Sequence, residues 1–220
     1  MVIFQSEVNM NQYLEHKEKG FYHLKNVIPD YVVLDLRERL VNLKIKYAER
    51  EGEPRHNGTG MFWKGLELAS TLDPNLWKYY KSEFMLDIAQ RFLDTDIPYL
   101  FNDQAVVKLP EEEFFFPPHT DNKFGPDPEG SLRGEFSTIN CCMILVDSPK
   151  EAGGISCFNK VTQEYEFIDT KAGDIIVIDG NTLHKSEVNN ITEPRPLYAC
   201  VYSTHPIGNH DKGYYSEKFI

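Results

Sequence analysis

The chain has 220 residues, of which 41% are hydrophobic and 13% aromatic, and its formal net charge at pH 7 is −11. This composition is typical of a folded globular protein. The acidic excess argues against nucleic-acid binding, because a phosphate backbone is recognised by clustered Lys and Arg. No apolar run reaches membrane-spanning length, and the first residues do not resemble a secretory signal. We therefore expect one domain in a soluble, cytoplasmic protein without a membrane partner.

Residues 1–95 are expected to form a mostly helical shell. Amphipathic spacing predicts helices over 10–20, 29–50 and 75–94. The first ends at Gly20, and the second opens with Pro29 and Asp30, which favour a first helical turn. A short strand is expected over 21–27. The two histidines of this shell, His16 and His23, are expected on its surface.

From residue 96 to 206 the pattern changes to short β-rich runs separated by turn residues, and a tail follows over 207–220. Strands are predicted over 97–101, 104–109, 113–116, 136–147, 153–159, 164–169, 173–179 and 196–205. Strands this dense, with no helix between them, favour a barrel or sandwich over a parallel α/β sheet. We expect a mainly β core with flanking helices.

The four cysteines are expected to be buried free thiols. None forms a CxxC pair, so neither a disulfide framework nor a zinc knuckle is indicated. Cys141 and Cys142 are adjacent on one predicted strand, and their side chains should therefore face opposite ways.

The most aromatic stretch of the chain, FFFPPHTDN over 114–122, ends in two good metal ligands. His119 and Asp121 are two positions apart, and in an extended strand such residues point to the same face. An imidazole and a carboxylate would then project side by side from a hydrophobic support. This pair supplies half of a metal site.

A second histidine completes the ligand set far downstream. His184 follows a predicted buried strand and a Gly-Asn turn. Two histidines and one carboxylate are the facial set that holds non-haem Fe(II) and leaves positions open for substrates. Ser186 comes two residues after His184, and Arg195 comes eleven residues after it. A guanidinium and a hydroxyl suit the carboxylate of a dicarboxylate cosubstrate.

The order HTD, distal histidine, serine and arginine resembles the Fe(II)/2-oxoglutarate dioxygenases, and most closely the phytanoyl-CoA dioxygenase family. The amino-terminal stretch KGFYHLKNVIPDYVVLDLRERL, residues 19–40, also resembles the opening of that family. The likeness therefore spans most of the chain. It implies a double-stranded β-helix, the jelly-roll fold of cupin-like proteins.

The resemblance also implies a set of site residues and cofactors. Fe(II) would be held by His119, Asp121 and His184, and the distal carboxylate of 2-oxoglutarate by Arg195 and Ser186, with O2 as the other substrate. Further candidates for cosubstrate binding are Gln104 and Lys108, on one face of the strand before HTD, and Thr138 and Asn140, on one face of another strand.

We expect such an enzyme to hydroxylate a C–H bond of a small molecule and to release succinate and CO2. The cationic residues Arg55, Lys64 and Arg133 favour a polar or anionic substrate. His56 lies in a polar, Gly-containing loop of the kind that active sites often use. Two alternatives remain open. One is a cupin-like metal enzyme that does not use 2-oxoglutarate, in which Arg195 is structural. The other is a non-catalytic, metal-stabilised binding module. The sequence does not indicate an oligomeric state.

Overall fold

The computed structural model describes residues 10–47, 65–67, 69–110, 112–124, 137–205 and 217–218. The expectations for Arg55, His56, Lys64 and Arg133, and for most of the 207–220 tail, lie outside these residues.

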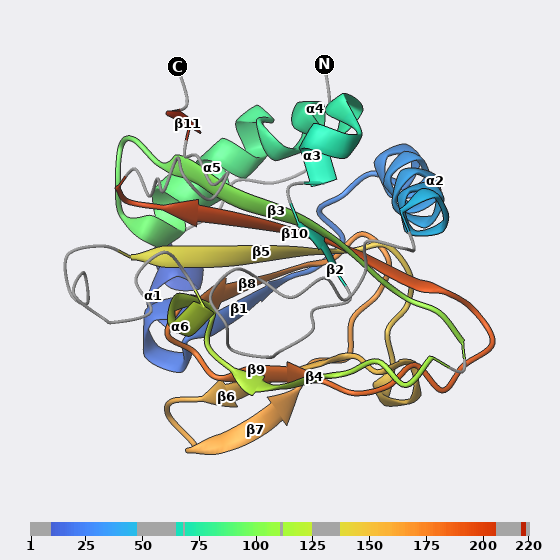
Figure 1. Cartoon of the computed structure of the whole chain (residues 1–220). Helices are drawn as coiled ribbons and strands as arrows, with labels where there is room; N and C mark the ends of the chain where they lie inside the picture. The colour runs from blue at the N-terminus through green and yellow to red at the C-terminus, as the bar shows by residue number, and fades with distance from the viewer. Residues whose placement is uncertain are drawn as a thin grey trace.

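Two antiparallel sheets face each other (Figure 1). The larger has the order β1-β8-β5-β10-β3-β11, with β2 also paired to β3, and the smaller has the order β4-β9-β6-β7. The strands of the larger sheet are β1 (Phe21–Leu24), β2 (Gly65–Glu67), β3 (Tyr99–Lys108), β5 (Thr138–Ile144), β8 (Ile175–Asp179), β10 (Arg195–Ser203) and β11 (Glu217–Lys218). Those of the smaller are β4 (Phe116–His119), β6 (Ile155–Asn159), β7 (Glu164–Phe167) and β9 (His184–Ser186).

Helices cover the face of the larger sheet that points away from the smaller one (Figure 1). The helical segments are α1 (Met10–Lys19), α2 (Asp30–Lys46), α3 (Ala69–Leu72), η2 (Pro74–Leu76), α4 (Trp77–Tyr80), α5 (Glu83–Leu93), α6 (Asp121–Phe124) and η3 (Lys150–Ala152). The prediction of a single helix over 75–94 was wrong, because this stretch forms three segments. Ser82 interrupts it, since its side chain accepts a hydrogen bond from the backbone N–H of Met85 and so begins α5.

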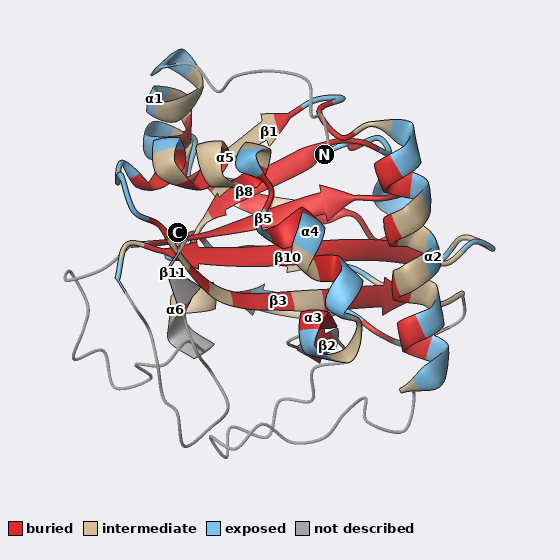
Figure 2. Ribbon diagram, turned by 90° about the horizontal axis from the view of Figure 1, so that it is seen from above, coloured by how far each residue is buried: buried red, intermediate tan, exposed pale blue. Residues whose placement is uncertain are grey.

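The alternation of side chains along the strands divides the core in two. Cys141 packs with the helices on the outer face of the larger sheet, whereas Cys142 packs between the two sheets. All four cysteines are free and buried, which confirms the prediction for them. Figure 2 shows β5 and β10 buried along their full length beneath the partly exposed helices. The site described below lies in the inner layer.

Two surface predictions were wrong. His16 is only 1% exposed, and its ring lies edge-on to that of Phe92 at 4.9 Å between centroids. This burial arises because α1 contacts α5 as well as β1 and β8. His23 is half-buried, and its Nε2 lies 2.7 Å from Oδ2 of Asp174.

The expected mainly β architecture with flanking helices is confirmed, and the two facing antiparallel sheets are those of a double-stranded β-helix. The strands predicted over 97–101 and 104–109 are one continuous strand, β3, and the strand predicted over 113–116 starts only at Phe116. Within the described ranges, no helix is both long and apolar enough to cross a bilayer.

Candidate metal centre

The two histidines meet because β4 and β9 pair across the smaller sheet. His119 ends β4, His184 begins β9, and the two are opposite one another in the strand register. Their ring centroids are 4.2 Å apart. Asp121 does not continue β4 as the extended-strand expectation required, because it opens the short helix α6. The turn after His119 still brings the Asp121 carboxylate close to both imidazoles.

The ligand atoms are spaced for a single ion. Oδ1 of Asp121 lies 3.7 Å from Nε2 of His119 and 3.6 Å from Nε2 of His184. Two ligands that each bind a metal at about 2.1 Å can be at most about 4.2 Å apart. The three residues are buried or half-buried, and they form the one such cluster of His, Cys, Asp and Glu side chains in the described part of the chain.

Backbone carbonyl groups orient both imidazoles. Nδ1 of His119 lies 2.8 Å from the carbonyl oxygen of Pro117, and Nδ1 of His184 lies 3.0 Å from that of Thr182. A carbonyl group only accepts hydrogen bonds, so each Nδ1 must carry the proton. In the neutral ring, each Nε2 then keeps the lone pair on the side of Asp121, which is the state that a metal requires.

The Asp121 carboxylate is held from the larger sheet. Nδ2 of Asn140 donates to Oδ2 of Asp121 over 3.0 Å, so Oδ1 remains for the two histidines. The neighbouring Thr138 hydroxyl donates to the side-chain oxygen of Asn122. Gly180 makes this contact possible, because a Cβ there would lie 1.8 Å from Oγ1 of Thr138. Thr138 and Asn140 thus contact two residues of α6, Asn122 and the metal ligand Asp121. Their predicted contact with a cosubstrate is untested.

Two buried cations lie on the inner face of the larger sheet. Lys108 and Arg195 are opposite one another in the β3–β10 register and are 0% and 2% exposed. Each shares a strand face with the residue two positions away, Val106 for Lys108 and Leu197 for Arg195, and both of these residues pack between the sheets. Burial lowers the pKa of Arg195 to about 10. Neither side chain forms an ion pair with any residue in the described ranges.

Serine hydroxyls accept a hydrogen bond from each of these cations. Nζ of Lys108 lies 2.8 Å from Oγ of Ser186 and also donates to the carbonyl oxygen of Glu187. Nε of Arg195 donates to Oγ of Ser148 over 3.2 Å. Ser186 was expected beside Arg195, but its hydrogen bond goes to Lys108. Ser148 was not predicted, because nothing near it in the sequence marks a site.

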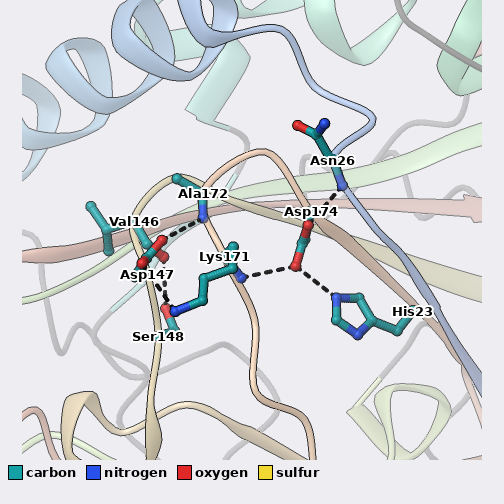
Figure 3. Close-up of polar contacts among 8 residues, drawn as sticks. All are labelled: His23, Asn26, Val146, Asp147, Ser148, Lys171, Ala172 and Asp174. Carbon is teal, nitrogen blue, oxygen red and sulfur yellow. Dashed lines mark hydrogen bonds and ion pairs between the residues drawn. The ribbon is translucent and has the colours of Figure 1, made fainter.

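The loop that carries Ser148 is anchored by the hydrogen bonds drawn in Figure 3. Oγ of Ser148 donates to the carbonyl oxygen of Val146 over 3.0 Å, and Asp147 accepts from the N–H of Ala172 and from Nζ of Lys171. Asp174 joins this turn to β1 through His23 and to the β1–α2 connection through the N–H of Asn26. Arg195 therefore hydrogen-bonds to a loop that several polar contacts hold in place. Gln104, the remaining candidate, is half-buried on the same strand face as Lys108.

A two-histidine, one-carboxylate cluster between the sheets of a double-stranded β-helix, beside two buried cations, defines the class of iron- and 2-oxoglutarate-dependent oxygenases. The family model described as "Phytanoyl-CoA dioxygenase (PhyH)" matches residues 16–196. The chain therefore belongs to the phytanoyl-CoA dioxygenase family, which confirms the resemblance seen in the sequence.

Solved structures support the fold at low sequence identity. The carbocyclase SnoK from nogalamycin biosynthesis is 18% identical with a TM-score of 0.74, and the match covers 89% of this chain and 84% of SnoK. The epimerase SnoN, in complex with Fe3+, alpha ketoglutarate and nogalamycin RO, is 16% identical with a TM-score of 0.71, covering 87% and 82%. EvdO2 from Micromonospora carbonacea var. aurantiaca, complexed with 2-oxoglutarate, is 16% identical with a TM-score of 0.69, covering 96% and 97%. No curated protein sequence matches the chain.

Proposed function

We propose that this chain is an Fe(II)- and 2-oxoglutarate-dependent dioxygenase that hydroxylates a C–H bond of a small, polar or anionic metabolite. His119, Asp121 and His184 would hold Fe(II) from one side and leave the opposite side for substrates. Bound Fe(II), with 2-oxoglutarate and O2, supplies the chemistry that inserts oxygen into a C–H bond while succinate and CO2 are formed. The protein supplies orientation and a site shielded from water.

The observation that carries the proposal is that neighbouring strand positions place the metal ligands and the buried cations side by side. His184 and Ser186 share one face of β9, because they are two residues apart. Ser186 contacts Lys108 at 2.8 Å, and Lys108 is the register partner of Arg195. A dicarboxylate that chelates the metal at one end would therefore meet cationic donors at the other.

The two buried cations also favour this reading over an enzyme that does not use 2-oxoglutarate. A buried ion without a counter-charge costs several kcal/mol, a cost that Arg195 incurs and that Lys108 also incurs whenever it is protonated. An anionic ligand supplies the missing charge. The preference for an anionic substrate rests on Arg55, Lys64 and Arg133, which lie outside the described residues.

The reaction type needs its own test, because structural neighbours are described as a carbocyclase and an epimerase. A metabolite screen with Fe(II), ascorbate and O2, followed by succinate release and product mass, separates the outcomes. A product that gains one oxygen supports hydroxylation. A product that loses two hydrogens or keeps the substrate mass would place the chain with cyclising or epimerising enzymes. Absence of succinate under all conditions would favour a non-catalytic binding module.

A further inference from the structure

Lys108 differs from a typical buried lysine in its surroundings. Lys44 has similar burial at 4% exposure, but its Nζ lies 3.1 Å from a carboxylate oxygen of Glu112. Lys108 is fully buried, and its two hydrogen bonds go to a hydroxyl and a backbone carbonyl, which are both neutral. A neutral amine has enough N–H groups to satisfy both acceptors, so these contacts do not require the ammonium form.

Of the two charged groups that act on Lys108, Arg195 opposes its protonation more strongly than Glu187 favours it. Arg195 faces it from the adjacent strand β10, and its permanent positive charge disfavours a second one. Glu187 favours protonation, but its side chain is half exposed and its carboxylate already pairs with Lys185 at 2.9 Å. On the remaining side lie the rings of Phe114 and Phe116, with centroids 5.5 and 5.7 Å from Nζ, and such cation–π contacts favour the ammonium form only modestly.

Desolvation is the largest effect on this group. Burial, together with Arg195, lowers the pKa of Lys108 to about 6. At neutral pH the ligand-free site therefore holds one positive charge, that of Arg195, and a neutral amine beside it. A carboxylate placed between the two strands would reverse this balance, because an adjacent anion favours the charged form of an amine.

We propose that 2-oxoglutarate binding draws one proton from solvent onto the Lys108 amine, so that a dianionic cosubstrate is matched by two cations only when it is bound. This inference rests on the proposed function, since it takes 2-oxoglutarate as the ligand. The proton adds to Nζ, no other bond changes, and Ser186 and the Glu187 carbonyl keep the resulting ammonium in place. The empty site avoids two adjacent buried charges, while the loaded site gains a charge-assisted contact.

The consequence is a cosubstrate affinity that depends on pH. Only the protonated lysine makes the full contact, so the affinity is highest at low pH. It falls by up to about tenfold per pH unit above the pKa of the free site. A site that held a permanently protonated lysine would bind 2-oxoglutarate equally across neutral pH.

The test is calorimetric titration of the Fe(II)-loaded protein with 2-oxoglutarate under nitrogen, at pH 7.5, in buffers of different ionisation enthalpy. The slope of observed enthalpy against buffer ionisation enthalpy counts protons, and we expect uptake of about one proton per ligand. Binding with a slope near zero would overturn the inference and leave the proposed function intact. Absence of binding in every buffer would instead refute the proposed cosubstrate.

Variants assign the proton to its site. Lys108→Met keeps a side chain of similar length without a basic group, and should bind more weakly with a slope near zero. Lys108→Arg retains a permanent charge, and should show no uptake and little pH dependence even if Lys108→Met folds poorly. Lys17→Met removes an exposed lysine and should keep the wild-type slope. Uptake that persists in both Lys108 variants would place the proton elsewhere and contradict the assignment.

Discussion

The side-chain amide of Asn140 donates a hydrogen bond to Oδ2 of Asp121 over 3.0 Å, across the gap between the larger sheet and α6. This contact leaves Oδ1 as the oxygen that faces both histidines, at 3.7 and 3.6 Å. The metal ligand is therefore oriented by a residue on a different element. Hydrogen bonds of this kind orient a metal ligand and raise the affinity of the site for its metal.

Replacing Asn140 with Ala should weaken Fe(II) binding while the fold is kept. Loss of a partner behind a metal ligand typically reduces affinity by about 10- to 100-fold. Competition with a chelator under anaerobic conditions would measure the Fe(II) affinity. Asn190 is an exposed asparagine whose amide contacts a backbone carbonyl, so Asn190→Ala is the matched control and should bind iron normally. Equal affinity in the two variants would show that Asn140 does not position Asp121.

His184→Ala should remain folded and lose iron, because a three-residue site depends on every ligand. Metal analysis of the anaerobically loaded protein, with circular dichroism for the fold, measures both. His205 is exposed, so His205→Ala should retain the metal content of the wild type. Near-normal iron in His184→Ala would remove this histidine from the ligand set.

Arg195→Ala should keep iron but weaken 2-oxoglutarate binding. A hydrogen bond to a charged group contributes about 1.5–3 kcal/mol. The dissociation constant should therefore rise by at least about tenfold. Titration of the Fe(II)-loaded protein gives this value directly, and an unchanged constant would favour the cupin-like alternative.

Ser148→Ala should have a smaller effect of the same kind. It removes the hydroxyl that accepts from Nε of Arg195 at 3.2 Å but leaves the guanidinium charge. We expect weaker 2-oxoglutarate binding than in the wild type, stronger than in Arg195→Ala, and unchanged iron affinity. The substitution should therefore affect only the contact with the distal carboxylate of 2-oxoglutarate and not the metal site. A loss of iron in this variant would indicate general damage to the inter-sheet layer.

Sequence reasoning found the chemistry of this site better than its contacts. His119, Asp121 and His184, which the structure brings together, and Arg195 were predicted because their residue types and order are distinctive. Ser148 could not be found, since only the fold brings its loop to β10. The place of Asp121 at the start of α6 was missed for a similar reason. Local spacing predicts an extended strand, whereas the turn after His119 depends on the hydrogen bonds of Asn122 with Gly180 and Thr138.

The burial of His16 leads to a prediction about acid stability. Desolvation lowers the pKa of His16 to about 4, and both ring nitrogens lack a hydrogen-bond partner among the described residues. The unfolded chain, with a histidine pKa near 6.5, binds more protons as the pH falls. The contribution of the neutral His16 ring to the stability of the fold is therefore fully present above about pH 6.5 and is lost towards pH 4. Between pH 7 and 5 it should fall by about 2 kcal/mol.

Denaturant unfolding at pH 7 and pH 5 measures that difference. His16→Leu keeps an apolar side chain against Phe92 and should show a smaller loss of unfolding free energy between the two pH values. His205→Leu alters an exposed histidine and should behave as the wild type. Equal pH dependence in all three proteins would show that His16 does not titrate with folding.

The central claim is that His119, Asp121 and His184 hold an iron that turns over 2-oxoglutarate bound at Lys108 and Arg195. Release of labelled CO2 from 2-oxoglutarate labelled at its first carbon tests it most directly, because it needs no knowledge of the substrate. We predict slow, Fe(II)-dependent release by the wild type that is abolished in His184→Ala and strongly reduced in Arg195→Ala. Equal release by the wild type and His184→Ala, or none by the iron-loaded wild type across a broad metabolite screen, would contradict the account.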